Sequence, residues 1–197
     1  MYYITLTGGK SVNDALNEML WSDDVNETDS TIKDYIDTWY ASNMTSYTSY
    51  LEDTVYCNDR SVYGLGGWNP NGGYTTGYLY FYSLKNQDLT CTNKNDRFTM
   101  SSTLGNGKLT YPVGLMTYGE AYLIGSTLRT TGQDYWLGSP NNFSNGDANG
   151  SQVTTSGSLN SSSRVDTARG ARPVVSLKPG TEYVDGKGSS DDPFLVD

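Results

Sequence analysis

The side chains that most often perform acid–base catalysis are scarce in this sequence. The chain of 197 residues contains 22 Asp and Glu residues but no histidine, so the commonest general base is missing. The adjacent carboxylates Asp23-Asp24 and Asp191-Asp192 lie in polar segments, where no apolar neighbour would raise a pKa. We therefore expect a protein that is not an enzyme and has no catalytic residues. A hydrolase that uses distant carboxylates remains open as an alternative.

Binding of phosphate groups and nucleic acid is also not expected. The glycine-rich run Tyr63-Gly64-Leu65-Gly66-Gly67 lacks the lysine and the following helix that a phosphate-binding loop requires. The net charge of −9 disfavours contact with a nucleic-acid backbone or with an anionic membrane surface.

Oxygen and amide donors are instead concentrated in one polar stretch, residues 141–167. This stretch separates two runs that we predict to be β-strands, residues 134–140 and residues 169–178. It consists mostly of Asn, Ser, Gly, Asp and Thr, with a hairpin predicted about Ser156-Gly157. Two strands that hold a long polar surface between them are typical of a scaffold that displays a variable face.

We expect the surface from 141 to 164 to contact a ligand, because Ser and Asn side chains supply adaptable hydrogen bonds in binding loops. The residues of this predicted contact set are Asn141, Asn142, Phe143, Ser144, Asn145, Asp147, Asn149 and Arg164. Four of them, Asn142, Asn145, Asp147 and Asn149, also carry the hard oxygen atoms that Ca²⁺ prefers. Their spacing does not match an EF-hand, so we expect a hydrated loop and no cofactor, with calcium as the open alternative.

The remaining elements must position this surface. Apolar spacing predicts helices at 11–20 and from Asp29 or Ser30 to Tyr40, the second with a buried stripe of Ile32, Tyr35, Ile36, Trp39 and Tyr40. Short strands are expected at 51–57, 78–84 and 193–196. Thr117 and Glu120 form a capping box for a helix over 118–124, in which Leu123 and Ile124 should be buried. Asp59 and Arg60 are interpreted as a local ion pair or as part of a turn.

The two cysteines, Cys57 and Cys91, favour a disulfide. The 17 tyrosines and 22 glycines give a composition typical of an extracellular protein, in which disulfides persist. The closed loop of about 35 residues would contribute on the order of 4 kcal/mol in the chain-entropy treatment. Two unrelated buried thiols are the alternative interpretation.

The sequence contains no apolar run long enough to span a bilayer, and its first residues, Met1 to Leu6, are typical of a strand rather than of a signal peptide. We expect an extracellular, cell-surface protein whose export and anchor segments are absent from this chain. A cytosolic or virion-borne protein is the alternative.

Several motifs resemble a family of bacterial surface proteins with a C-type-lectin-like fold, which is related to the fold of formylglycine-generating enzymes. The resemblance is carried by Tyr135–Pro140, Gly170–Leu177, Gly188–Phe194, Asp37–Tyr40 and Leu51–Ser61. It covers roughly residues 30–197 and implies an α+β fold with small twisted antiparallel sheets, two to three short helices and long ordered loops. Many members occur in gut Firmicutes behind pilin-like or signal-anchor segments.

The chemistry of the characterised relatives does not carry over. Calcium-dependent lectins use Glu-Pro-Asn or Gln-Pro-Asp and Trp-Asn-Asp motifs, whereas this chain has Ser139-Pro140-Asn141 and Trp68-Asn69-Pro70. Formylglycine-generating enzymes need two late cysteines, but both cysteines here precede residue 92. The Asn-rich segment 141–151 is also similar to the variable face of retroelement-diversified proteins, with an ordinary polar loop as the preferred interpretation.

We therefore interpret residues 1–197 as a single domain, with a helical part at 11–40 and a strand-rich display part at 130–197. The expected function is non-enzymatic binding of a host or bacterial surface protein or glycan, through the surface at 141–164. The alternative is a structural subunit of a surface pilus or filament, in which strands near the two chain ends pair between copies.

Overall fold

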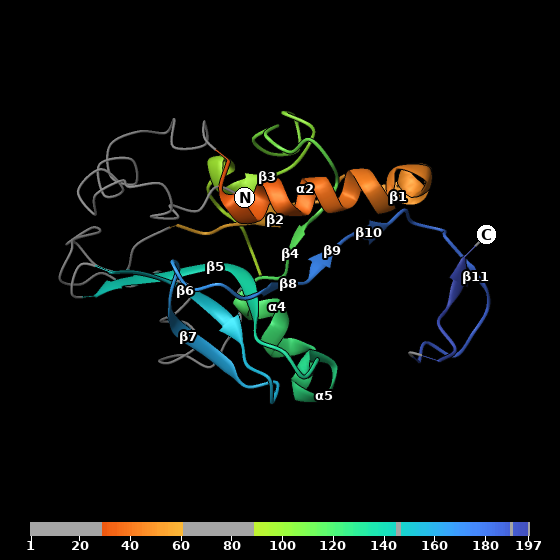
Figure 1. Ribbon diagram of the computed structural model, residues 1–197. Helices are drawn as coiled ribbons and strands as arrows, with labels where there is room; N and C mark the ends of the chain where they lie inside the picture. Colours follow the sequence, from red (N-terminus) through yellow and green to blue (C-terminus); the bar gives the residue numbers. More distant parts are fainter. Residues whose placement is uncertain (1–28, 61–88, 145–146, 190, 197) are drawn as a thin grey trace.

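The structure is a computed structural model, and it describes residues 29–60, 89–144, 147–189 and 191–196. In these segments a few helices pack against several small sheets whose strand pairs are mostly antiparallel (Figure 1). The expected α+β class is confirmed at this level. The helix expected at 11–20 and the strand expected at 78–84 lie outside the described residues. Within the described segments, no helix has the length and hydrophobicity needed to cross a membrane.

Helix α2 (Thr31–Asn43) begins where the sequence predicts a cap. The Ser30 hydroxyl accepts a hydrogen bond from the Lys33 amide at 3.2 Å and satisfies one of the free amides of the first turn. Ile36 and Tyr40 are buried as expected, with 1% and 0% of their surface exposed. A 3₁₀ helix, η1 (Thr45–Tyr50), follows directly and leads into the first small sheet.

Before residue 181, most of the described strands contain only two residues. These strands are β1 (Leu51–Glu52), β2 (Tyr56–Cys57), β3 (Arg97–Phe98), β4 (Gly114–Leu115), β8 (Gly170–Ala171), β9 (Pro173–Val174) and β10 (Ser176–Leu177). β1 pairs with β10, β2 with β3, and β4 with β9, all antiparallel. A short 3₁₀ helix, η3 (Lys94–Asp96), precedes β3.

The run 169–178 is not the single strand that its composition predicts. It is divided into β8, β9 and β10, and each of the three pairs with a different strand. Arg172 and Val175 lie between these strands, and Pro173 has no N–H to donate to a ladder. The chain therefore changes its partner twice in this run and links three sheets.

The largest described sheet has the strand order β7-β6-β5-β8. Its long strands are β5 (Tyr135–Ser144), β6 (Asp147–Val153) and β7 (Leu159–Arg164). β5–β6 and β6–β7 are antiparallel, and β5–β8 is parallel. The predicted hairpin about Ser156-Gly157 is confirmed, with Gly157 at φ +77° in the turn between β6 and β7. The polar stretch thus consists mainly of paired strands.

Two short helices, α4 (Tyr118–Leu123) and α5 (Gly125–Arg129), cover one side of this sheet (Figure 1). The predicted capping box is confirmed, since the Glu120 amide donates to the Thr117 hydroxyl at 3.1 Å and the Glu120 carboxylate accepts from the Thr117 amide at 2.7 Å. The expected burial of Leu123 is wrong, because its side chain is 58% exposed. The helix is only six residues long and turns other positions toward the sheet.

Three clusters of buried side chains form the core of the described segments. One lies under α2 and contains Ile36, Tyr40, Leu51, Val113 and Leu115. The second joins α4 to β5 and β6 and contains Tyr118, Ala121, Tyr135, Leu137 and Val153. The third lies beside β2 and β3 and contains Tyr56, Phe98 and Leu109.

Cys57 and Cys91 form the predicted disulfide, with their Cα atoms 5.8 Å apart. Next to it, Arg60 makes a longer-range ion pair that the sequence did not predict. The Arg60 guanidinium binds Asp96, with Nε 2.6 Å from Oδ1. Asp96 is only 2% exposed, and a buried carboxylate needs a cation and hydrogen bonds, so this partner is preferred.

Near the end of the described chain lies a C-terminal hairpin, which we define as residues 181–189 and 191–196. Its strands β11 (Tyr183–Asp185) and β12 (Leu195–Val196) pair with each other in a two-stranded sheet. The strand expected at 193–196 is therefore present, though shorter. The hairpin stands away from the rest of the molecule at the C-terminal end (Figure 1).

Candidate functional site

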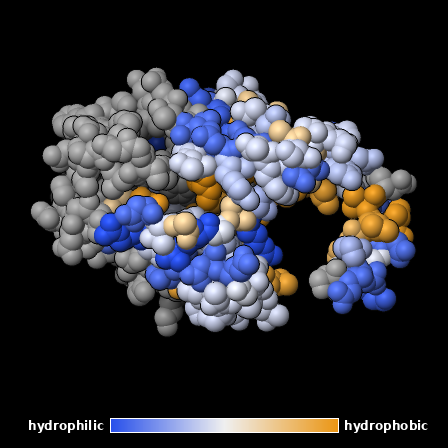
Figure 2. All heavy atoms as spheres, viewed as in Figure 1, coloured by the Kyte–Doolittle hydropathy of each residue, from blue (hydrophilic) through white to orange (hydrophobic). Residues whose placement is uncertain are grey.

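A cavity of about 470 Å³ lies between the N-terminal part of α2 and the largest sheet. Its wall on the sheet side contains Trp136 and Leu137 of β5 and Gly150 of β6, and its floor is the segment 165–171. Figure 2 shows hydrophobic residues in a recess below the N-terminal end of α2, beside a hydrophilic surface. The volume is within the range of about 300–1,000 Å³ that ligand pockets usually have.

Trp136 supplies the largest flat apolar surface of this cavity. It pairs with Gln152 of β6 and, on its other side, with Ala171 of β8. A β-carbon at Gly150 would lie at ordinary contact distance from the indole (3.4 Å from Cζ3) and from Val165 (3.6 Å), so both side chains lie against the backbone of β6 at this position. The indole is therefore held in place by two neighbouring strands.

Arg169 lies over the same ring. Its guanidinium carbon is 5.3 Å from the indole centroid, and its Nη1 donates to the Asp134 carboxylate at 2.6 Å. Asp134 also accepts a hydrogen bond from the Thr155 amide at 2.8 Å, so this carboxylate is itself fixed by the β6–β7 turn. The arginine Nε is buried and has no hydrogen-bond partner. A rigid stack of cation and aromatic ring results at the edge of the cavity.

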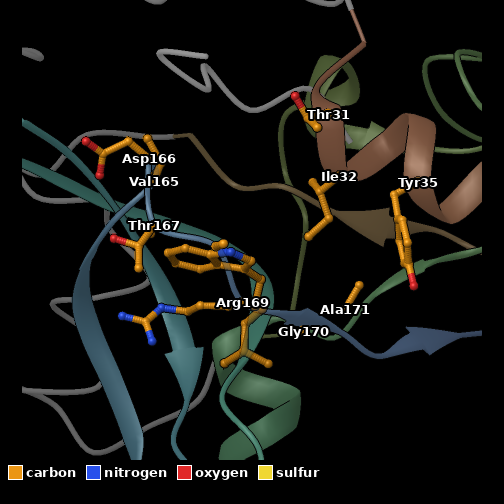
Figure 3. Close-up of a pocket in the computed structure, with 13 residues that line it drawn as sticks. Thr31, Ile32, Tyr35, Val165, Asp166, Thr167, Arg169, Gly170 and Ala171 are labelled. Atoms are coloured by element: carbon orange, nitrogen blue, oxygen red, sulfur yellow. The ribbon is translucent and has the colours of Figure 1, made fainter.

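Helix α2 forms the opposite wall with Thr31, Ile32 and Tyr35. Figure 3 shows Ile32 and Tyr35 projecting from the helix toward the side on which Gly170 and Ala171 lie. Tyr35 was expected to be buried with the rest of the helix stripe, but it is 61% exposed. Helix α2 turns Ile36 and Tyr40 into the core, and this orientation leaves Tyr35 at the rim of the cavity.

The electrostatics of the cavity suit binding better than proton transfer. Among the described residues, three have a resolved pKa shift, and Asp166 is the one of these that lines the cavity. A hydrogen bond from Arg164 lowers the pKa of Asp166, so this carboxylate is ionised at neutral pH. The two side chains form an exposed ion pair at 2.6 Å. A carboxylate with a lowered pKa is a poor general acid.

The predicted contact set is placed differently from the expectation. Asn141, Asn142 and Asn149 are buried, with 1%, 7% and 8% exposure, so the expectation that they face solvent is wrong. Arg164 is exposed as expected. The ligand-binding role of these residues stays a prediction.

The structure brings part of this set together. Asn142, Asn149 and Arg164 occupy adjacent register positions on β5, β6 and β7. Phe143 and Ser144 lie in β5 and Asp147 lies in β6, but the positions of these three side chains are not described. Asn145 lies outside the described residues. In the described segments, no group of three His, Cys, Asp or Glu side chains is placed to hold a metal ion.

Several of the buried amides lack hydrogen-bond partners. Both side-chain polar atoms of Asn141 are buried and unpartnered, as are Oδ1 of Asn142 and Oε1 of Gln152. Buried amides without partners are uncommon, and ordered water often satisfies them. This sheet therefore has a polar interior, unlike the apolar side on which Tyr135 and Leu137 pack.

Sequence reasoning missed the residues that shape the cavity, above all Tyr35, Arg169 and Gly150. Trp136 and Arg169 stand in the two runs that the sequence predicts as strands, but their contact depends on the parallel pairing of β5 with β8.

Comparison of the sequence with protein-family models, with curated proteins and with solved structures finds no match. The likeness to C-type-lectin-like surface proteins consequently rests on the sequence motifs alone.

Proposed function

We propose that this protein is a non-enzymatic binding module whose ligand enters the cavity between α2 and the largest sheet. The observation that carries the proposal is the fixed indole of Trp136, with Arg169 5.3 Å from its centroid, in a concave site of about 470 Å³. Apolar walls with a few placed polar groups are the usual make-up of a ligand site.

The proposed partner is a protein or glycan on a host or bacterial surface. Aromatic side chains with a polar edge, such as Trp136 and Tyr35, can stack on an apolar or sugar face and still reach water. Asp166 and Arg164 at the rim add charged hydrogen-bonding groups. The exposed part of the predicted 141–164 surface, including Arg164, adjoins the cavity and extends the proposed contact area.

We also propose an extracellular, cell-surface location and a C-type-lectin-like arrangement of the chain. The disulfide between Cys57 and Cys91 supports an oxidising compartment. The small antiparallel sheets and few helices support the fold resemblance at the level of class.

Two exposed tyrosines allow a matched test. Tyr35 lines the cavity and is 61% exposed, whereas Tyr47 lies outside the cavity lining and is 52% exposed. Wild type, Tyr35→Ala and Tyr47→Ala would be applied to a glycan array and to a panel of bacterial and host surface proteins. Ligands found in this way would be titrated while tryptophan emission is followed.

We expect Tyr35→Ala to weaken binding by about tenfold or more, as the loss of an aromatic anchor does, with an unchanged melting temperature. Tyr47→Ala should bind like wild type. Equal binding by all three proteins would remove the cavity as the site. Turnover of a glycan on the array would instead support the hydrolase alternative.

A further inference from the structure

The cavity between α2 and the largest sheet has mainly apolar walls. Apolar side chains line it from α2, from β5 and from the floor, namely Ile32, Trp136, Leu137, Val165, Ala168 and Ala171. Figure 3 shows Ile32 and Val165 on opposite sides of the space. An apolar group that enters would leave water and meet apolar atoms on both sides, which is favourable.

The cavity is large enough for a bulky group. Its volume is about 470 Å³, whereas a dry cavity of about 150 Å³ already holds a benzene ring. An aromatic or branched aliphatic side chain therefore fits, together with part of the backbone that carries it. Tyr35 is 61% exposed at the rim and can cover this backbone.

Both charged side chains of the described lining, Arg169 and Asp166, already have a partner of opposite charge. Nη1 of Arg169 lies 2.6 Å from Oδ2 of Asp134, and Oδ2 of Asp166 lies 2.6 Å from Nη2 of Arg164. The four charges cancel. A charged group that entered would lose its water without finding an uncompensated opposite charge in the described lining, and such burial is costly.

The polar side chains of the lining are concentrated at its exposed edge. Thr31, Tyr35, Asp166 and Thr167 are all exposed, whereas Leu137 is only 2% exposed. The Thr167 hydroxyl donates a hydrogen bond to Asp166 and so satisfies part of that edge internally. A sugar in the cavity would press several hydroxyl groups against apolar walls, where a hydroxyl without a partner costs free energy. An apolar side chain has no such groups.

An apolar interior with a polar rim is the usual anatomy of a protein–protein contact. We propose that the cavity receives an uncharged, apolar side chain of a partner protein, and that its two ion pairs exclude charged side chains. The inference rests on the proposed binding function of the cavity and names its partner class. A glycan partner is the outcome that the experiments below must distinguish.

The first experiment measures which side chain the cavity prefers. The probes are the N-acetyl amides of phenylalanine, leucine, lysine and glutamate, which share one backbone, and N-acetylglucosamine. Saturation-transfer NMR on the full chain would rank them, with Trp136→Phe to show that the signal comes from the cavity. The phenylalanine and leucine probes should bind at least about tenfold more tightly than the two charged probes, because a charge would be buried unpaired.

The second experiment releases one charge at a time. Asp134→Asn removes the charge beside Arg169, while its Oδ1 can still accept from the Thr155 amide, which it contacts at 2.8 Å. This variant should bind the glutamate probe about tenfold better relative to the phenylalanine probe, since hydrogen bonds to charged groups are strong. Arg164→Gln releases Asp166 and should favour the lysine probe in the same way.

Asp192→Asn is the matched control, because it breaks the ion pair with Lys187 at 2.9 Å outside the cavity lining. It should leave the ranking of all five probes unchanged. Melting temperatures would show that each variant is folded. If Asp134→Asn does not fold, Arg164→Gln tests the same argument, because both members of its ion pair are exposed.

Three results would overturn the inference: no saturation transfer to any amide probe, equal binding of charged and apolar probes by wild type, or the same ranking in the charge-release variants. Tighter binding of N-acetylglucosamine than of every amide would replace the protein partner by a glycan and leave the proposed binding function intact. If the apolar probes bind as expected but Tyr35→Ala binds every surface ligand normally, the proposed function fails instead.

Discussion

The ring of Tyr56 packs on the backbone of Gly114, so that a β-carbon at position 114 would lie 2.4 Å from Cδ1 of the ring. The Tyr56 hydroxyl donates to the Pro112 carbonyl at 2.9 Å and fixes the ring in this position. The contact joins β2 of one small sheet to β4 of another. Only a residue without a side chain allows this approach.

Gly114→Ala is expected to lower the free energy of unfolding by about 2 kcal/mol, the usual cost of forcing atoms into a filled core. Chemical denaturation monitored by circular dichroism would measure the change. Gly132→Ala is a suitable control, because Gly132 has φ +75° but no atom within 4 Å of an added β-carbon. The control should lose only the backbone strain, about 1 kcal/mol. A smaller loss at position 114 than at position 132 would contradict the packing argument.

Removal of the disulfide is expected to destabilise the protein strongly. The bond between Cys57 and Cys91 spans 34 residues of sequence, for which loop-closure entropy gives about 4 kcal/mol. The double variant Cys57→Ser, Cys91→Ser should melt at a lower temperature, and reducing agent should lower the melting temperature of wild type alone. A reductant-insensitive wild type would show that the thiols are not paired in solution.

The ion pair of Arg60 and Asp96 should make stability depend on pH. Burial raises the pKa of Asp96, and the charge and hydrogen bonds of Arg60 oppose this rise. A carboxyl group with a raised pKa favours folding most below its unfolded pKa of about 4, and this contribution is lost as pH rises through the folded pKa.

Arg60→Ala should therefore cost about 3 kcal/mol at pH 7, where a buried carboxylate is left unpaired, and clearly less at pH 4, where Asp96 takes up a proton. Urea titrations at both pH values would measure the difference. Asp166→Ala breaks an exposed ion pair with Arg164 and should leave stability unchanged at either pH. An equal cost of Arg60→Ala at pH 4 and pH 7 would argue against a buried charge.

The contact of Arg169 with Trp136 can be tested without a ligand. Arg169→Lys keeps a positive charge near Asp134 but loses the planar guanidinium, so we expect a loss of about 0.5–1 kcal/mol and a shift in tryptophan emission. Arg172→Lys is the matched control, because Arg172 lies 5.7 Å from the ring of Tyr135 instead. Identical emission spectra for the two variants would contradict the contact with Trp136.

Features that depend on neighbouring residues could be predicted from the sequence. The Ser30 cap, the capping box of Thr117 and Glu120, and the turn at Gly157 are confirmed, because their hydrogen bonds and backbone angles involve residues only a few positions apart. The pairing of Cys57 with Cys91 is also confirmed, since these are the only two cysteines of the chain.

Features that depend on distant pairing could not be predicted in the same way. Arg60 pairs with Asp96, which lies 36 residues away and is buried. The burial of Asn141 follows from its place in β5, although its side chain is polar. The sequence shows which side chains are polar. The register of the sheet decides which of these side chains face solvent and which face the core.

The division of residues 170–177 among three sheets has a mechanical consequence. Tension on the C-terminus would first open the β11–β12 pair and would then load β10, β9 and β8 in turn, each of which holds only two residues. These short strand pairs should therefore break one after another, each at low force. A force applied at the C-terminal hairpin would thus be dissipated in steps before it reached β5, the long strand that contains Trp136.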